Sequence, residues 1–228
     1  MTRVLITGAS RGIGRATALA CAARGTELGL FGRASAEQRE TAALCLKLGA
    51  PRVLPLIADA RHEGDLERAA QEFLNSLGPP DAVIHNAGIA ARTRIEDTSP
   101  SSWQEHLQVN LSAPFLLTRA LLPAMRAHGS GRFIFVASIS ATLGTANLSA
   151  YCASKWGIIG FMKSLAVELS DSGLMTCAVL PGAVDTQMLI GSGFPARMSA
   201  ESVAQTLVHY AFDAPLAHNG ASIEMFGT

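Results

Sequence analysis

The sequence predicts an α/β fold, a single Rossmann-type doubly wound parallel sheet of about seven strands with helices on both faces. Short apolar runs alternate with longer helical stretches along the whole chain. Most of these runs are continuously apolar rather than alternating, which is typical of strands buried on both faces of a parallel sheet. No repeat, linker or low-complexity tract divides the 228 residues, so we expect one domain over 1–228.

The expected strands are the short runs rich in Val, Ile, Leu and Phe, bounded by glycine, proline or polar residues. They lie at 4–7, 28–31, 53–57, 82–85, 133–137, 176–180 and 221–225. Pro55 weakens the third run, because proline cannot donate to a sheet ladder. For the same reason, we expect Pro181 to stop the sixth strand.

The expected helices are the longer stretches between these strands, where apolar residues recur with helical spacing. They lie at 13–23, 36–48, 64–77, 102–127, 151–170 and 199–212. Pro114 and Pro123 are expected to interrupt the longest of them. The segment 187–198 carries Gly191, Gly193 and Pro195, so we expect an irregular substrate loop that is either mobile or shaped by its ligand.

Composition narrows the class of protein. Hydrophobic residues make up 49% and charged residues 16%, as in globular proteins, and 18 basic residues balance 18 acidic ones. Zero net charge gives no sign of a nucleic-acid partner. No leader or membrane-length apolar run is present, so the cytoplasm is the expected location. Four cysteines without a CxxC pair or a histidine cluster predict reduced thiols and no metal site.

A glycine-rich turn follows the first expected strand. It reads Thr7-Gly8-Ala9-Ser10-Arg11-Gly12-Ile13-Gly14, with GxxxGxG spacing. Glycines let the backbone come close to a ligand, and the following helix aims its N–H groups and positive end at a pyrophosphate. Such a turn by itself can be only a turn, but its place after the first strand of an α/β pattern favours dinucleotide binding.

Tyr151 and Lys155 stand four positions apart on an expected helix, so both project from one face. Carbonyl reduction needs a proton donor at the oxygen, and a free tyrosine has a pKa near 10. A neighbouring ammonium favours the phenolate, so Lys155 is expected to lower the pKa of Tyr151. Taken alone, this spacing is more often a surface pair.

With other motifs in order along the chain, these features resemble the short-chain dehydrogenase/reductase family. The first is TGxxxGIG, which is similar to the family's cofactor loop. The remaining matches are Asp59 with Ala60 after the third strand, Asn86-Ala87-Gly88 after the fourth, Asn110 in the long helix, Ser138 at the end of the fifth strand, Tyr151 with Lys155 as YxxxK, and Pro181-Gly182 with Val184 and Thr186 after the sixth.

The resemblance implies roles for these residues. Tyr151 is the catalytic acid, Ser138 holds and polarises the substrate oxygen, and Asn110 anchors a water in a proton relay. Lys155 also hydrogen-bonds the nicotinamide ribose. The cofactor-binding residues implied are Gly8, Ser10, Arg11, Gly12, Ile13, Gly14, Arg33, Asp59, Ala60, Asn86, Ala87, Gly88, Tyr151, Lys155, Pro181, Gly182, Val184 and Thr186.

The end of the second strand predicts which nicotinamide is preferred. NAD-preferring Rossmann proteins place an acidic residue there to hold the ribose 2′-OH. Here the residues are Leu30-Phe31-Gly32-Arg33, and Arg11 adds a second guanidinium nearby. Two guanidinium groups suit a 2′-phosphate, so we expect NADP(H) to be preferred over NAD(H). The alternative is that Arg33 only faces solvent.

These expectations lead to NADPH-dependent reduction of a ketone or aldehyde. The sequence looks most like the 3-oxoacyl-acyl-carrier-protein reductase branch, so a 3-oxoacyl thioester is a candidate substrate. Its substrate loop is short for the family, and 222–228 lacks a common double glycine. The alternatives are an NADP-dependent alcohol dehydrogenase working oxidatively and a catalytically silent cofactor-binding regulator. A methyltransferase also has a glycine turn after the first strand of a Rossmann-like sheet, but the YxxxK motif has no role in that class of enzyme.

Several residues keep two interpretations. Arg92 and Arg94 either meet an anionic substrate or carrier, or lie on a solvated loop. His85 and His106 have no partner that the sequence identifies, so packing or surface positions are expected. The family resemblance implies a homotetramer or homodimer built from the helices at 102–127 and 151–170.

Overall fold

The computed structural model describes residues 1–227, and its centre is one parallel sheet of seven strands. The strand order is β3-β2-β1-β4-β5-β6-β7, so the chain winds outward from β1 in one direction and from β4 in the other. This confirms the expected fold class. The strands are β1 (Arg3–Thr7), β2 (Glu27–Gly32), β3 (Val53–Ile57), β4 (Ala82–His85), β5 (Gly131–Val136), β6 (Leu174–Pro181) and β7 (Ala221–Met225).

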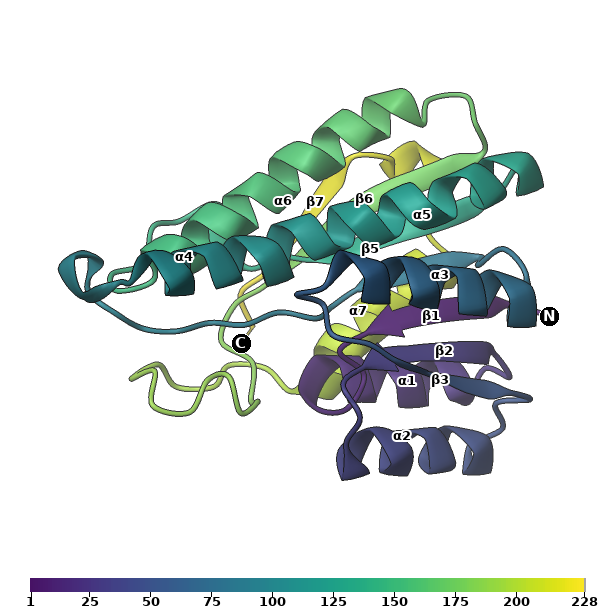
Figure 1. The fold of residues 1–228 in the computed structure, drawn as a ribbon, viewed down its shortest axis with the longest axis horizontal. Helices are drawn as coiled ribbons and strands as arrows, with labels where there is room; N and C mark the ends of the chain where they lie inside the picture. Colours follow the sequence, from purple (N-terminus) through teal and green to yellow (C-terminus); the bar gives the residue numbers. More distant parts are fainter. Residues whose placement is uncertain (228) are drawn as a thin grey trace.

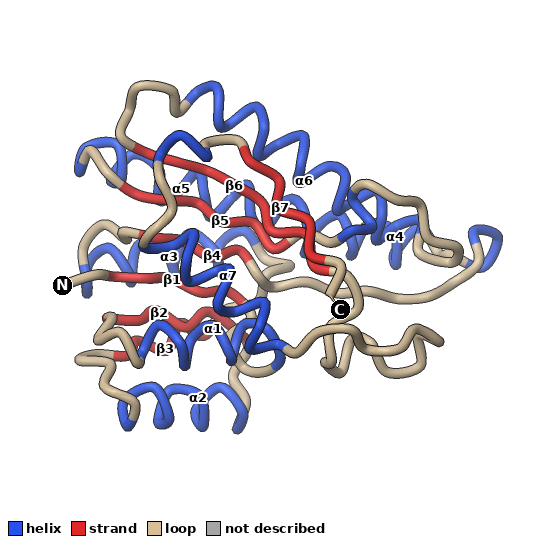
Figure 2. The backbone as a smooth tube through the Cα atoms, turned by 180° about the vertical axis from the view of Figure 1, so that it is seen from behind, coloured by secondary structure: helices blue, strands red, loops and turns tan. Residues whose placement is uncertain are grey.

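Helices cover both faces of the sheet (Figures 1 and 2). One hydrophobic core holds residues of α1, α2 and α7, and the other holds residues of α3, α5 and α6, with α4 packed on α6. Within residues 1–227, no helix is both long and apolar enough to cross a membrane. The helices are α1 (Gly12–Ala22), α2 (Ala36–Lys47), α3 (Glu63–Leu77), α4 (Pro100–Leu107), α5 (Ala113–His128), α6 (Ser149–Glu168) and α7 (Ala200–Phe212).

The central strands are buried as the continuous apolar runs predict. Every residue of β4 and of β6 is buried, because helices pack on both faces of the sheet. Gly29 of β2 shows how closely one face is filled, since a Cβ added there would lie 2.5 Å from the Phe73 ring of α3. Close packing of this kind fixes the height of the helices above the sheet and therefore the shape of its carboxyl edge.

Strand β6 ends at Pro181, as expected, and Pro181 pairs with Met225 of β7 as the last residue of the strand. The expected interruption at Pro123 was wrong. Pro123 lies inside α5 without ending it. Its side chain and Arg119 are exposed, so water can satisfy the Arg119 carbonyl that loses its hydrogen bond. Near Pro114 the expected interruption exists as a π-helical turn, η2 (Gln108–Ser112), between α4 and α5.

His85 closes β4 and lies in the core rather than at the surface. Its ring stacks on Phe135 with 4.7 Å between centroids, and its Nε2 lies 3.0 Å from the Thr118 hydroxyl of α5. The sequence identified no partner for this residue, and the structure supplies two. Burial lowers the pKa of His85 to about 3.

This burial makes folding dependent on pH. The folded pKa lies below the ordinary histidine value of 6.5, so between pH 6.5 and 3 the unfolded chain binds more protons than the folded one. Stability is therefore lost as pH falls through that window. From pH 7 to pH 5 we expect His85 to reduce the free energy of unfolding by about 2 kcal/mol.

Urea unfolding at both pH values, with wild type and His85→Phe, measures this contribution. The wild type should lose about 2 kcal/mol more than the variant between pH 7 and pH 5. His62→Gln, a change at an exposed histidine, is the control and should keep the wild-type dependence. Equal losses in wild type and His85→Phe would refute the assignment.

Candidate active site

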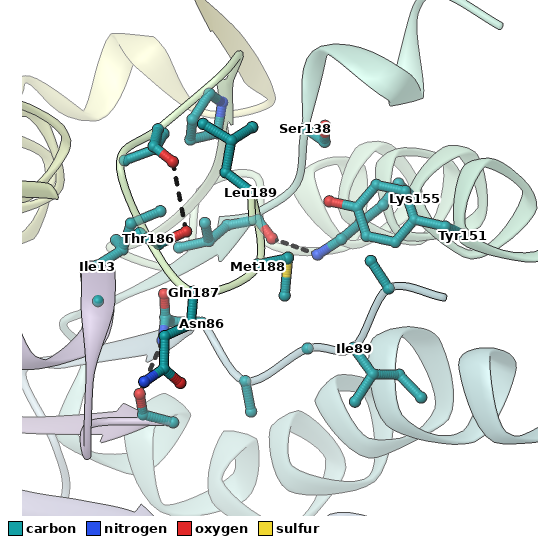
Figure 3. A pocket seen from close by; sticks show the side chains of 18 of the residues that line it. Ile13, Asn86, Ile89, Ser138, Tyr151, Lys155, Thr186, Gln187, Met188 and Leu189 are labelled. Carbon is teal, nitrogen blue, oxygen red and sulfur yellow. Dashed lines mark hydrogen bonds between the residues drawn. The ribbon is translucent and has the colours of Figure 1, made fainter. Parts of the chain in front are cut away.

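A cleft of about 1650 Å³ opens at the carboxyl edge of the sheet, where loops after β1, β4, β5 and β6 meet. The glycine loop lies at one end, and Ser138, Tyr151 and Lys155 lie at the other (Figure 3). The segment after β6, yellow-green in Figure 1, extends past the strand ends beside it. Of the residues predicted for the site, all line this cleft except Gly14 and Asn110, which lie behind its wall.

The glycine loop forms a cradle with room for a pyrophosphate. Gly8 and Gly12 have φ values of 69° and 54°, a backbone region that side chains disfavour. An added Cβ at Gly8 would lie 2.9 Å from Ala87 Cα. Helix α1 begins at Gly12, and the Arg11 side chain does not cap it. The first N–H groups of α1 therefore point toward the cleft, as a dinucleotide phosphate requires.

The loops after β1 and β4 are locked together. The Thr7 hydroxyl accepts hydrogen bonds from the backbone N–H groups of Asn86 and Ala87, both at 2.9 Å. The Asn86 amide donates in return to the carbonyls of Thr7 and Gly8 at 3.0 and 3.1 Å. The two motifs that the sequence places 79 residues apart thus form one rigid floor for the cofactor end of the cleft.

Tyr151 and Lys155 come from the first half of α6, and Ser138 follows β5. The Lys155 Nζ donates to the Val136 carbonyl at 2.8 Å and lies 5.7 Å from the centroid of the Tyr151 ring. Ser138 Oγ accepts a bond from the Ser140 N–H at 3.1 Å, which orients the hydroxyl. Strand β5 and helix α6 therefore bring together the three polar groups on which the sequence-based prediction depends (Figure 3).

The sequence predicted that the pKa of Tyr151 is lowered, and this prediction was wrong. Burial raises the pKa of Tyr151, and it outweighs the opposing effects of the Ser138 hydroxyl and the Arg92 charge. Burial also lowers the pKa of Lys155 to about 8. At neutral pH the phenol thus keeps its proton, and most of the lysine keeps its charge.

Asn110 supports the cleft from behind. It lies in the π-helical turn η2, and its side chain binds the backbone of Ile89 twice, accepting from the N–H and donating to the carbonyl, each at 2.9 Å. Its amide also donates to Ser154 of α6 at 3.0 Å, and the Ser154 hydroxyl donates to the Tyr151 carbonyl at 2.7 Å. Asn110 therefore ties the loop after β4 to the helix that carries Tyr151.

His106 is a second support that the sequence analysis missed. Its ring is buried, and Nε2 accepts a bond from the Ala91 N–H at 3.0 Å while Nδ1 lies 2.8 Å from the Ser102 carbonyl. The two ring nitrogens therefore tie the loop after β4 to the first turn of α4. Of the two expected positions, packing or surface, His106 has the packed one. Its place four residues before Asn110, on the same side of the helical stretch, was the available signal.

Three charged residues predicted to bind the cofactor, Arg33, Arg11 and Asp59, line the cleft, and two of them are bound to other side chains. Arg33 lines the cleft, as predicted. Arg11 also lines it, but its Nη1 donates to Gln187 Oε1 at 2.5 Å and so reaches toward the loop after β6. Arg61 holds the Asp59 carboxylate at 2.6 Å, and this hydrogen bond lowers the pKa of Asp59 to about 2.

The loop 187–198 is irregular, as expected, and forms one wall of the cleft. An isolated bridge between Val184 and Met198 closes its base. Apolar side chains from this loop face the cleft, among them Met188, Leu189 and Phe194. Figure 3 shows Met188 and Leu189 in the same space as Tyr151 and Lys155. A substrate held against Tyr151 would therefore contact a largely apolar cover.

Comparison with known proteins supports these features. A family model described as short chain dehydrogenase matches residues 2–193. The 3-oxoacyl-[acyl-carrier-protein] reductase of Synechocystis is 31% identical over 98% of this chain and 85% of its own length. Levodione reductase superposes with a TM-score of 0.93 at 28% identity, covering 99% of this chain and 96% of its own.

A second solved structure is that of a putative NAD(P)-dependent gluconate 5-dehydrogenase from Beutenbergia cavernae with bound NADP. It is similar to this chain with a TM-score of 0.89 and 31% identity, over 98% of this chain and 94% of its own. The glycine cradle, the cleft at the carboxyl edge and the family match agree with one another. The chain therefore belongs to the short-chain dehydrogenase/reductase family and is an NAD(P)-dependent oxidoreductase.

Proposed function

We propose that this protein reduces a ketone or aldehyde with NADPH and that Tyr151 is the general acid. The observation that carries the proposal is the grouping of Ser138, Tyr151 and Lys155 in one wall of the cleft that begins at the glycine loop. When bound, the nicotinamide supplies the hydride for the carbonyl carbon. The chain's own residues then handle the proton and the charge at the carbonyl oxygen.

Each of the three side chains has a part in that step. The Tyr151 phenol donates its proton to the carbonyl oxygen, and its raised pKa keeps the proton in place until charge develops there. Lys155, 5.7 Å from the ring centroid, stabilises the phenolate that remains. The Ser138 hydroxyl holds and polarises the same carbonyl oxygen. Asn110 positions Ile89 and, through Ser154, the turn of α6 that carries Tyr151.

The name of the Synechocystis relative supports a 3-oxoacyl thioester as one substrate to try. The test follows the absorbance of reduced nicotinamide with NADPH or NADH and a panel of ketones that includes acetoacetyl-coenzyme A. NADPH-dependent turnover of any ketone supports the proposal, and the alcohol products with NADP⁺ measure the oxidative direction. NADPH binding without turnover in either direction would overturn it and favour a silent cofactor-binding regulator.

The preference for NADP(H) is a further part of the proposal. Arg33 lines the cleft at the end of β2, where the chain has no acidic residue, and a guanidinium suits a 2′-phosphate. The neighbour from Beutenbergia cavernae has NADP bound. Arg11 also lines the cleft, where its Nη1 donates to Gln187, and its remaining donors can add to the positive charge at this end.

Two variants measure that preference. Arg33→Ala should weaken NADPH binding about tenfold or more while changing NADH binding little, because only NADPH carries the 2′-phosphate. Gly32→Asp should shift the preference toward NADH by charge repulsion, and its Cβ has room, since the nearest atom is 3.6 Å away on Gln38. Fluorescence titration of both nicotinamides gives the affinities. Equal affinity of the wild type for NADPH and NADH would refute the preference.

We also propose a homodimer or homotetramer in the cytoplasm. Exposed aromatic side chains on α4, α5 and α6, namely Trp103, Phe115 and Trp156, support assembly through these helices. The location rests on the sequence alone. Sedimentation equilibrium gives the mass in solution, and a monomer would exclude the assembly.

A further inference from the structure

Arg92 lies in the wall of the cleft, on the loop between β4 and α4. Its guanidinium donates to the Met188 carbonyl at 3.5 Å, and so reaches across to the loop that covers the substrate space. Its positive charge also acts on the Tyr151 phenol and opposes the effect of burial there. Arg92 therefore belongs to the reactive end of the cleft rather than to the cofactor end.

The backbone on both sides of Arg92 is held in place. The preceding residue, Ala91, donates its N–H to the buried His106 ring at 3.0 Å. The following residue, Thr93, donates its N–H to the Asn147 carbonyl at 2.9 Å. A loop residue with hydrogen bonds of this kind on either side starts from a fixed position, and less entropy is lost when its side chain binds a ligand.

Among the described residues, Arg92 forms no ion pair. This distinguishes it from the arginine nearest to it in sequence, Arg94, which pairs with Glu96, and from Arg61 of the cleft, which pairs with Asp59. Arg11, Arg33 and Arg197 also line the cleft without an ion pair among the described residues, but Arg92 is the one whose charge acts on Tyr151. Within residues 1–227, its guanidinium forms one hydrogen bond to the protein, to the neutral Met188 carbonyl at 3.5 Å. Most of its five donors are therefore left to water or to a ligand.

We infer that Arg92 is a specificity residue that binds an anionic group, a carboxylate or a phosphate, on the carbonyl substrate. The inference rests on the proposed function, because the carbonyl must lie at Tyr151 and Ser138. A guanidinium binds such groups through paired, charge-assisted hydrogen bonds. An ordinary thioester has no charge beside its carbonyl, so the inference selects oxo acids or oxo phosphates from the wider substrate class.

The experiment uses pairs in which one member carries an anionic group and the other is the neutral ester or alcohol of the same ketone. The pairs are 4-oxopentanoate and its methyl ester, 3-oxobutanoate and its methyl ester, and dihydroxyacetone phosphate and dihydroxyacetone. In wild type the anionic member should have the higher kcat/KM in at least one pair, and the first two pairs distinguish a carboxylate from the phosphate of the third. In Arg92→Ala the ratio of anionic to neutral kcat/KM should fall about 10- to 100-fold.

Arg94→Ala is the matched control. It removes a guanidinium two positions away that is 71% exposed, paired with Glu96 and outside the cleft. It should keep the wild-type ratio. An equal ratio in wild type and Arg92→Ala would overturn the inference, and so would the same fall in both variants. A uniform loss for charged and neutral ketones would also overturn it, since Arg92 would then act through Tyr151.

Binding without turnover separates this inference from the proposed function. Calorimetric titration of the enzyme–NADP⁺ complex with each member of the three pairs needs no chemistry. Tighter binding of an anionic member, lost in Arg92→Ala but kept in Arg94→Ala, supports the inference even if no ketone is reduced. Equal binding of both members in every pair would overturn it even if neutral ketones are reduced.

Discussion

Tyr151→Phe should lose nearly all turnover, with kcat reduced about 10²- to 10⁴-fold, while the affinity for NADPH stays within about twofold. The substitution removes one oxygen from a buried ring and leaves its packing in α6 unchanged. What it removes is the only proton that Tyr151 can give to the carbonyl oxygen. Steady-state kinetics with the best ketone of the panel and fluorescence titration of NADPH measure the two quantities.

The chain offers a close control for this experiment. Tyr210 is its other tyrosine, and it lies on α7, outside the cleft. Tyr210→Phe makes the same chemical change without touching the site, so it should keep wild-type kcat. If Tyr151→Phe retains a tenth or more of the wild-type kcat, Tyr151 is not the general acid.

Gly14→Ala should abolish useful cofactor binding, with the affinity for NADPH weakened about 100-fold or more. A Cβ at Gly14 would lie 2.2 Å from the Gly8 carbonyl oxygen and 2.5 Å from the Asn86 amide nitrogen. Neither can move freely, because Asn86 is bonded to Thr7 and to Gly8. The methyl group therefore displaces the glycine loop itself, and we expect a stability loss of about 1–3 kcal/mol as well.

Thermal unfolding and NADPH titration separate the two effects of Gly14→Ala. Gly64→Ala is the control, because Gly64 also lies in the first turn of a helix, and an added Cβ there meets no atom within 4 Å. That variant should keep wild-type affinity and stability or gain slightly in stability. A folded Gly14→Ala protein with wild-type affinity for NADPH would show that the loop does not form the pyrophosphate cradle.

Much of the site was predictable because its signals are local or strongly periodic. The apolar runs of β4 and β6 predicted strands buried on both faces, and both are buried throughout. The glycine loop, Ser138, Tyr151 and Lys155 occupy fixed places relative to strand and helix ends. Since the carboxyl ends of parallel strands share one edge of a sheet, their approach follows from the fold class.

Other features depend on contacts between distant segments. Pro123 was expected to interrupt a helix, but its solvent exposure removed most of the cost. His85 is within hydrogen-bond distance of Thr118, and His106 is hydrogen-bonded to the Ala91 N–H. These pairs are distant in sequence, and only the packing of the fold brings them together. Single-sequence patterns report the face on which a residue lies and not the atom that it meets.

The sequence by itself determined the fold class, the position of the glycine loop and the polar groups that meet in the cleft, because each depends on short-range spacing. Only the tertiary structure decided the protonation behaviour and the charge environment of the site. Burial raises the pKa of Tyr151 where spacing alone predicted lowering, Arg11 turns toward Gln187, and Arg92 enters the cleft without an acidic partner among the described residues. Desolvation and ion pairing depend on everything around a group in space, and neighbours in sequence are a small part of that.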